Sequence, residues 1–206
     1  QGNQVFGTNG IALRTPDLIT FGSALPKWVG GFNNAFDYKG VHLSFLIDFK
    51  LGNKMLSGTN FNAIRHGLHK MTLAGREVGD QPGPGSIVGE GSKITGQDAN
   101  GDDIFAPNDI AASVQPFWEV VRSQALIEPV VYDGGFWKLR QITLGYDFTK
   151  YLPQRFPVKS VRLSFVASNV LMLKKWVDNI DPESFGYSSD NIVGMESTGV
   201  PTTRSM

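Results

Sequence analysis

The chain has 206 residues, no cysteine, and 19 basic residues (Lys and Arg) that balance 19 acidic ones, so its formal net charge is zero. This neutrality excludes proteins that hold nucleic acid through clustered positive charge, and the lack of cysteine excludes disulfide scaffolds, iron–sulfur clusters and thiolate zinc sites. No run of about 18 apolar residues is present, so no transmembrane helix is predicted. The 24 Gly and 14 Phe residues favour an all-β protein.

Apolar and polar residues alternate in four stretches, at the period of two that indicates a β-strand. In chain order the stretches cover residues 28–39, 41–50, 136–148 and 161–169. Each is longer than the roughly 5–6 residues of a typical soluble strand and matches the roughly 9–11 residues that cross a bilayer as a tilted strand. The four stretches therefore predict an antiparallel β-sheet built from unusually long strands.

The connections between these stretches alternate between short and long. The corner at 37–40 and the proline-containing segment 149–160 are short, whereas 51–134 and 172–200 are long. Transmembrane β-barrels alternate short periplasmic turns with long extracellular loops in this way. Within the first long connection, residues 60–70 and 110–124 have a helical pattern, and the Gly- and Pro-rich residues 81–101 predict a mobile loop.

The alternation assigns the two faces of the predicted sheet to different surroundings. In a membrane barrel the apolar face meets lipid, and the residues predicted to face lipid are Phe45, Ile47, Leu144, Leu163 and Phe165. The polar face then lines the lumen, and aromatic residues gather at the strand ends, where Trp28, Tyr38, Trp137 and Tyr146 lie. The same alternation also fits a soluble β-sandwich, in which it separates core from solvent, so a secreted binding or adhesion module is the alternative.

Four segments carry a resemblance to a known family. They are residues 28–39 (WVGGFNNAFDYK), 135–146 (GFWKLRQITLGY), 161–171 (VRLSFVASNVL) followed by Asp181-Pro-Glu183, and 201–205 (PTTRS). These segments resemble the C-terminal barrel region of SusC/RagA-type TonB-linked outer-membrane proteins of Bacteroidetes. The resemblance implies that residues 1–206 are the C-terminal part of a TonB-dependent receptor β-barrel of roughly 22 strands. It also implies that the plug domain and one final strand lie outside this chain.

The resemblance further implies a function and a location. Such proteins are multi-pass proteins of the bacterial outer membrane that actively import oligosaccharides or peptides. They work with a SusD-like surface lipoprotein and receive energy through TonB, which contacts their N-terminal part. Because the family's C-terminus is periplasmic, strand parity predicts that residues 161–171 run outward, so that loops 51–134 and 172–200 are extracellular.

No enzyme and no cofactor are predicted. The sequence has no G-x-S-x-G elbow and no Walker loop, and nothing fixes Glu119 and Glu128 at the spacing of a glycosidase pair. His66 and His69 have a metal-compatible spacing, but Gly67 interrupts a helix there, so exposed loop histidines are the favoured interpretation.

Two features of the predicted extracellular loops stay open as candidate sites. Asp98, Asn100 and Asp102 resemble half of a calcium loop, although a polar surface turn is the favoured interpretation. Three loop aromatic residues are candidate partner or substrate contacts: Trp118, Tyr132 and Trp176. Packing of the loops against one another is the alternative explanation for these aromatic residues.

Overall fold

A computed structural model describes residues 3–78, 81–82, 85–154, 157–184, 193–197 and 199–206. The chain divides into two compact units. Residues 22–56 and 132–206 form one, called here the sheet unit, and residues 1–21 and 57–131 form the other, called the insert unit. The described part is mostly β-strand with few, short helices. None of the helices in that part has the length and apolar character needed to span a membrane.

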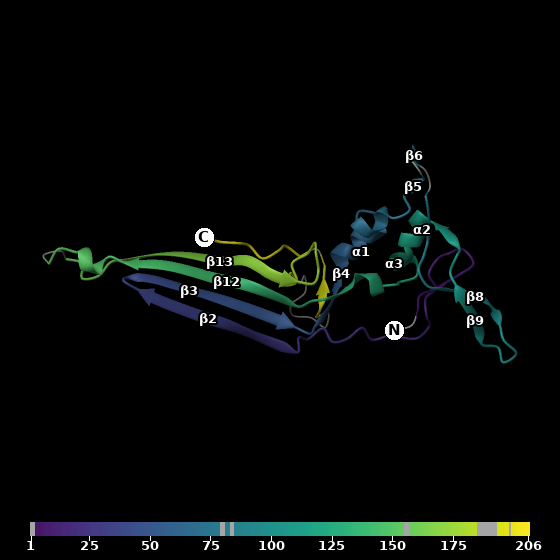
Figure 1. The fold of residues 1–206 in the computed structure, drawn as a ribbon, viewed down its shortest axis with the longest axis horizontal. Coiled ribbons are helices and arrows are strands. Elements are labelled where there is room, and N and C mark those ends of the chain that lie inside the picture. Colours follow the sequence, from purple (N-terminus) through teal and green to yellow (C-terminus); the bar gives the residue numbers. More distant parts are fainter. Residues whose placement is uncertain (1–2, 79–80, 83–84, 155–156, 185–192, 198) are drawn as a thin grey trace. The chain divides into compact units, whose positions relative to one another are not determined.

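Four long antiparallel strands dominate the sheet unit (Figure 1). They are β2 (Trp28–Tyr38), β3 (Val41–Leu51), β12 (Phe136–Asp147) and β13 (Arg162–Lys175), in the spatial order β13-β12-β3-β2. All four predicted strands are confirmed, and β13 continues to Lys175, beyond its predicted end. The sheet is open, and the described strands do not close into a barrel.

The connections of this sheet follow the predicted pattern. Lys39 and Gly40 join β2 to β3 in a two-residue turn with φ of 48° and 88°, the backbone that matches the right-handed twist of paired strands. The connection from β12 to β13 lies at this same end and includes the 3-10 helix η3 (Thr149–Tyr151). At the opposite end, Phe136 pairs with both Lys50 and Lys175, so the two long connections begin at one end of the sheet, as strand parity predicts.

A second, smaller sheet has the order β11-β4-β14. Its strands are β4 (Lys54–Ser57), β11 (Val131–Asp133) and β14 (Met195–Glu196). Met55 packs there with Val177 and Ile180 in a buried apolar cluster, against which Tyr132 also packs. This cluster is buried, whereas most large apolar side chains of the four long strands are half-buried or exposed, with Phe136 an exception.

The insert unit contains short strands and helices. Its strands are β1 (Val5–Phe6), β5 (Glu77–Val78), β6 (Gln81–Pro82), β7 (Ser86–Val88), β8 (Ser92–Gln97), β9 (Asp103–Pro107) and β10 (Ala111–Ser113). Its helices are α1 (Gly58–Arg65), α2 (Val114–Trp118) and α3 (Val120–Ser123), with 3-10 turns η1 (Lys70–Leu73) and η2 (Glu128–Val130). The ring of Phe6 stacks on that of Phe117 at 6.2 Å, and Ile64 and Val121 are buried.

Sequence patterns predicted the helices of this unit but not its hairpin. The helical patterns are confirmed by α1, α2 and α3, and Gly67, with a φ of +69°, lies just beyond the end of α1. The prediction of a mobile loop over residues 81–101 is wrong for β7 and for β8, which pairs with β9. The carboxylate of Asp98 accepts the backbone N–H groups of Asn100 and Asp102, at 2.8 and 3.0 Å, and thereby closes the β8–β9 turn.

Candidate functional site

Strand pairing places most of the large apolar side chains of the four long strands on one face of the sheet, called here the apolar face, whereas Leu46 and Phe136 lie on the other face. Residues directly opposite each other on antiparallel strands lie on the same face. One such row across the sheet consists of Phe36, Leu43, Leu144 and Phe165. The residues predicted to face lipid all fall on this face: Phe45, Ile47, Leu144, Leu163 and Phe165. That the face contacts lipid stays a prediction.

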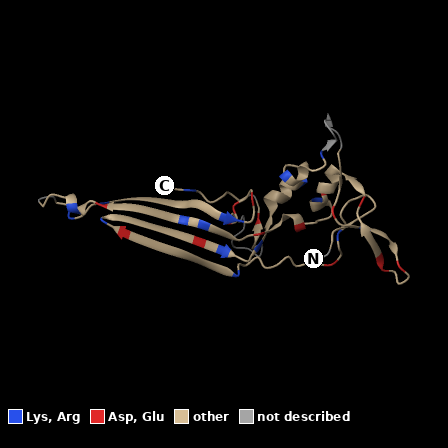
Figure 2. Cartoon of the chain, viewed as in Figure 1, with Lys and Arg blue, Asp and Glu red and all other residues tan. Residues whose placement is uncertain are grey.

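The apolar face is open in the described structure. Leu144, Leu163 and Phe165 are 50%, 69% and 51% exposed, although side chains of this kind are normally buried in soluble proteins. In β2 the residues before Asp37 are all uncharged (Figure 2). A contiguous exposed apolar surface of this kind marks a site of contact with a membrane or another protein.

Aromatic side chains form a rim at each end of the apolar face. At the end where the long connections begin, Trp137 stacks on Phe49 and Phe32, with ring centroids 4.5 and 6.2 Å apart. At the hairpin end, the hydroxyl groups of Tyr146 and Tyr151 lie 3.1 Å apart, and the Lys150 ammonium is 4.8 Å from the Tyr151 ring centroid. Amphipathic rings and lysines are enriched where a membrane meets water.

A β-bulge in β12 keeps the two faces distinct. Leu139 pairs with Ile47 but Gln141 pairs with Leu46, so Arg140 is an extra residue on its strand. The bulge keeps Leu139 on the apolar face while Lys138 lies opposite Asp48 on the polar face. Without the extra residue, the side chains of β12 on one side of Arg140 would project from the opposite face of the sheet, because the side-chain period of a strand is two.

The polar face carries a cluster of ion pairs centred on Arg140. The guanidinium donates to Asp48 of β3 from Nε at 2.9 Å and from Nη2 at 2.5 Å. It also donates to both carboxylate oxygens of Glu183, from Nη2 at 2.5 Å and from Nη1 at 3.0 Å. Nη1 further donates to the side-chain oxygen of Asn169, a residue with a φ of 53°, which asparagine tolerates better than most residues.

Lys138 extends this cluster toward the C-terminal residues. Its ammonium donates to Glu183 at 2.5 Å and to the hydroxyl of Thr202 at 2.7 Å, and the residue is only 3% exposed. The Thr202 hydroxyl donates in turn to Asp181 at 2.7 Å. Ser205 then exchanges backbone hydrogen bonds with Ser168 of β13 in an antiparallel bridge. The cluster therefore fixes the segments around residues 181–183 and 202–205 to the polar face.

The charges of this cluster stabilise one another. Burial by itself raises the pKa of Glu183, but the hydrogen bonds and positive charges of Arg140 and Lys138 outweigh it and hold that pKa below its ordinary value. A buried ion pair is favourable only when its remaining polar atoms are also bonded. Here the lysine and arginine donate to several acceptors, whereas the buried Oδ1 atom of Asp48 has no hydrogen-bond partner among the described residues. Chemically the arrangement is an anchor, since its polar groups bind one another.

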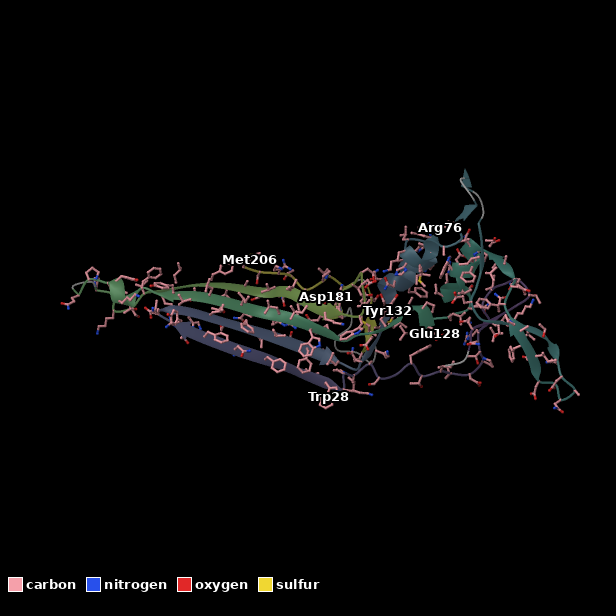
Figure 3. All side chains as sticks on the ribbon, in the orientation of Figure 1. Trp28, Arg76, Glu128, Tyr132, Asp181 and Met206 are labelled. Atoms are coloured by element: carbon pink, nitrogen blue, oxygen red, sulfur yellow. The ribbon has the colours of Figure 1, made fainter. Side chains whose placement is uncertain are left out.

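The three candidate loop aromatic residues have different surroundings. Tyr132 packs on the buried cluster of Met55, Val177 and Ile180 and so contributes to the core of the sheet unit, where Figure 3 labels it. Trp176, also in the sheet unit, is 44% exposed, with the Lys174 ammonium 5.3 Å from its ring centroid. Trp118 is half-buried in the insert unit, edge-on to Phe117. Trp176 is therefore the most accessible of the three.

The residues considered as metal ligands have other contacts. His66 is the C-cap of α1, and the Nδ1 atom of His69 accepts the backbone N–H of Met71. The Asp98 carboxylate holds the β8–β9 turn, and these backbone hydrogen bonds keep its pKa below the ordinary value. Within the described ranges, no group of three acidic, histidine or cysteine side chains is arranged to hold a metal ion.

Comparisons with known proteins give similarity in fold alone. No family model and no curated protein matches the sequence. Chains of the RagAB peptide importer in its "open-open" and "closed-closed" states align with TM-scores of 0.55, identities of 18% and 15%, and coverage of 89% and 94% of this chain. A structure of the RagAB peptide transporter aligns with a TM-score of 0.54 at 15% identity over 89% of this chain. The alignments cover only 16–18% of those chains.

Sequence reasoning missed the Arg140 cluster. Asp48 lies 92 residues and Glu183 43 residues from Arg140 in the sequence, so no local pattern connects them. One signal was present, because the apolar positions of β12 change from odd to even numbers between Leu139 and Ile142. Such a change of parity within a strand indicates a β-bulge, and bulges often lie beside functional groups.

If the apolar face contacts lipid, we expect Leu144→Arg to destabilise the protein in a bilayer by about 2–4 kcal/mol, the cost of a cation near the bilayer midplane. The control is Thr143→Arg, one residue away on the polar face, which we expect to cost much less. Urea unfolding of both variants in lipid vesicles measures the two costs. Equal costs would show that the faces are wrongly assigned.

We expect Glu183→Gln to lower the melting temperature, because Lys138 and Arg140 lose their shared counter-charge. Removing one partner of a fully buried ion pair costs about 3–5 kcal/mol, which is an upper limit here since the Arg140 side chain is 28% exposed. Asp147→Asn is the control, because its pair with Arg162 is longer, at 3.6 Å, and more exposed. A similar loss in both variants would contradict the anchoring role.

The lowered pKa of Glu183 also predicts how the melting temperature changes with pH. A carboxylate with a lowered pKa contributes stability above its unfolded pKa of about 4.3, and this contribution is lost as the pH falls through the folded pKa. The unmodified protein should therefore lose more stability than Glu183→Gln between pH 6 and the acid range.

Proposed function

We propose that this chain is part of an outer-membrane importer, in which the four long strands belong to the wall of a β-barrel. One observation carries the proposal: a sheet of four long strands has an exposed apolar face with aromatic rims at both ends and a polar face on the other side. Lipid would cover the apolar face, and the barrel lumen would hold the ion cluster.

Bilayer physics supports this proposal. A tilted strand needs roughly 9–11 residues to cross the hydrocarbon, and the four strands have 11–14. Backbone groups at the edges of β2 and β13 would be unpaired in lipid, so further strands must complete the wall. We propose a barrel of roughly 22 strands, with the plug domain and final strand outside this chain. Ser205 pairs with Ser168 of β13 in an antiparallel bridge, which is the direction in which a following barrel strand would pair with β13.

The alternative, a soluble β-sandwich, finds less support. A sandwich buries its apolar face against a second sheet. In the described residues Leu163 and Phe165 are more than half exposed. The polar face of a sandwich would meet water, whereas here Lys138 is buried beneath other segments of the chain.

We propose that the imported substrates are peptides or oligosaccharides, with peptides first because the structural neighbours are chains of a peptide importer. The proposed work is binding and passage, driven through TonB, with no covalent chemistry and no cofactor. The protein would be a multi-pass protein of the bacterial outer membrane. Both long connections, residues 51–134 and 172–200, would then be extracellular, and the β2–β3 turn periplasmic.

We propose a SusD-like surface lipoprotein as the partner on the extracellular side. Two of the three candidate residues are less accessible to a partner. Tyr132 packs on the buried cluster of the sheet unit, and Trp118 is half-buried. Trp176 remains exposed, near the end of β13 where a long connection begins. Large aromatic side chains dominate the energetics of protein interfaces, so Trp176 is the proposed anchor.

Single cysteines test location and orientation, because residues 1–206 contain none. We expect Ala99→Cys, at the exposed β8–β9 turn, to react with a membrane-impermeant thiol reagent in intact cells. Ser160→Cys, exposed in the short connection between β12 and β13, should react only after the outer membrane is permeabilised. Labelling is read by the mass shift of the purified protein, and the unmodified protein is the blank. The reverse labelling pattern would contradict the orientation, and labelling of both sites in intact cells would contradict the location.

Co-purification of the lipoprotein tests the partner surface. We expect Trp176→Ala to reduce the amount recovered at least tenfold, as loss of a central aromatic anchor commonly costs about 2 kcal/mol or more. The matched control is Trp28→Ala, an exposed tryptophan at the same end of the sheet whose ring lies on the apolar face. Full recovery with Trp176→Ala would exclude this residue as the anchor.

A further inference from the structure

A lysine and two tyrosine side chains gather at the hairpin end of the apolar face, where β2 turns into β3. The Lys150 ammonium lies 4.8 Å from the ring centroid of Tyr151 and 5.9 Å from that of Tyr146. The two tyrosine hydroxyl groups are 3.1 Å apart. Tyr146 lies on the apolar face, because it pairs with Leu163 and Val41. One ammonium and two hydroxyl groups are therefore grouped beside that face.

A hydrogen-bonded turn holds this group in place. The Asp147 carboxylate accepts the backbone N–H of Thr149 at 2.8 Å. The carbonyl oxygen of Phe148 accepts the backbone N–H of Tyr151 at 2.9 Å. These bonds support the 3-10 helix η3, which carries both Lys150 and Tyr151. The backbone of the two side chains is therefore fixed directly after the end of β12.

The donors of this group have no acidic partner. Lys150 forms no salt bridge with the carboxylates that the structure describes. Asp147, the acidic residue that follows Tyr146, pairs instead with Arg162 on the polar face. When one tyrosine hydroxyl donates to the other, the second keeps its proton for another acceptor. The group therefore offers an ammonium and one O–H group to a molecule outside the described chain.

The charge at this end of the sheet indicates the kind of acceptor. No acidic residue lies on the apolar face of the four long strands, which the structure describes in full. Lys39, in the turn between β2 and β3, adds a second ammonium, 5.1 Å from the ring centroid of Tyr38. Tyr38 pairs with Val41, which pairs in turn with Tyr146, so both lysines lie at the same end of the apolar face. Two cations without an acidic counterpart on that face favour an anion.

The depth of the group in a bilayer would match that of lipid phosphates. Trp137 lies opposite Phe49 of β3, and Tyr146 lies opposite Val41, so eight residue steps separate the two aromatic rims. At about 3.4 Å per residue the rims are about 27 Å apart along the strands, and a tilt of about 40° reduces this to roughly 21 Å across the membrane. The apolar band of a membrane barrel is about 25 Å tall. Polar groups just beyond Tyr146 would therefore lie where the headgroups begin.

We propose that Lys150, Tyr146 and Tyr151 bind the phosphate of an anionic phospholipid in the leaflet at the hairpin end. The tyrosine rings contact the lipid chains, and the ammonium and hydroxyl groups donate to the phosphate oxygens, as charge-assisted hydrogen bonds. A headgroup with no cation of its own suits the two lysines best, because they repel a second cation. The inference rests on the lipid contact in the proposed function but not on which leaflet the hairpin end faces.

Native mass spectrometry of the native protein, released from detergent micelles, tests this site with three probes. The first is dimyristoyl phosphatidylglycerol, which is anionic. The second is dimyristoyl phosphatidylcholine, with the same chains and phosphate but no net charge. The third is glycerophosphoglycerol, the anionic headgroup without chains. Titration gives the Kd of the first molecule bound. We expect phosphatidylglycerol to bind about 5- to 30-fold more tightly than phosphatidylcholine, since each lysine near an anionic lipid contributes a preference of about fivefold.

Three variants connect that preference to the group. Lys150→Gln removes the ammonium and should weaken phosphatidylglycerol about fivefold or more. Tyr146→Phe combined with Tyr151→Phe keeps both rings and removes both hydroxyl groups, which should weaken it about 2- to 10-fold. Lys159→Gln is the matched control, because Lys159 is exposed in the same connection and its ammonium lies over no aromatic ring that the structure describes. The control should stay within about twofold of the unmodified protein.

Three results would overturn the inference. The first is equal affinity for the two lipids, and the second is unchanged binding of phosphatidylglycerol in both cluster variants. The third is glycerophosphoglycerol that binds as tightly as the intact lipid, which would indicate a site for soluble phosphodiesters instead.

Failure of the underlying lipid contact has a different signature. In that case neither lipid binds, and Leu144→Arg costs no more than Thr143→Arg. A reversed pattern in the cysteine labelling would change only the leaflet in which the lipid lies. Failure of this inference and failure of the proposed function are therefore distinguishable.

Discussion

The pairing register of the four long strands is the constraint on which the sheet unit depends. Because side chains alternate with a period of two, a slip of one residue between β3 and β12 would move every large apolar side chain of one strand to the polar face. The bulge at Arg140 is part of this constraint, since it lets Trp137 and Leu139 share a face with Ile142 and Leu144. The same bulge directs the guanidinium toward Asp48 and Glu183. One extra residue therefore serves both the apolar face and the ion cluster.

The ion cluster needs arginine at its centre for a geometric reason. A guanidinium offers donors in a planar fork, so it bonds two carboxylates and an amide oxygen at once, which a lysine ammonium cannot do with the same fixed geometry. Lys138 donates to Glu183 and Thr202 from a single nitrogen atom, which needs no planar fork. Glu183 accepts from both cations and so joins the segment after β13 to the sheet wall. The anchor consists of contacts distant in sequence, and it orders chain segments that have no regular secondary structure of their own.

The sequence was informative where the physics is local. Period-two alternation predicted all four long strands, and helical spacing predicted α1 and α2. The β8–β9 hairpin was missed because the glycines and prolines of residues 81–101 suggested a mobile loop, whereas β8 pairs with β9 and Asp98 closes the turn between them. The Arg140 cluster was missed because it joins residues from β3, β12 and the segment after β13.

The two units differ in how freely their residues can change, and this difference affects which unit can adapt to a particular ligand. In the sheet unit, every second residue of the four long strands must be compatible with the apolar face. Few positions there can therefore change to accommodate a different ligand. The insert unit has its own buried residues, among them Ile64 and Val121, and its elements are short. Loops carried by a rigid scaffold accept changes in sequence at lower cost, and binding residues concentrate there for that reason. Side chains of the insert unit can therefore change without disturbing the register that the long strands require. On this reasoning a change in the sequence of the insert unit disturbs the fold less than a change in the four long strands.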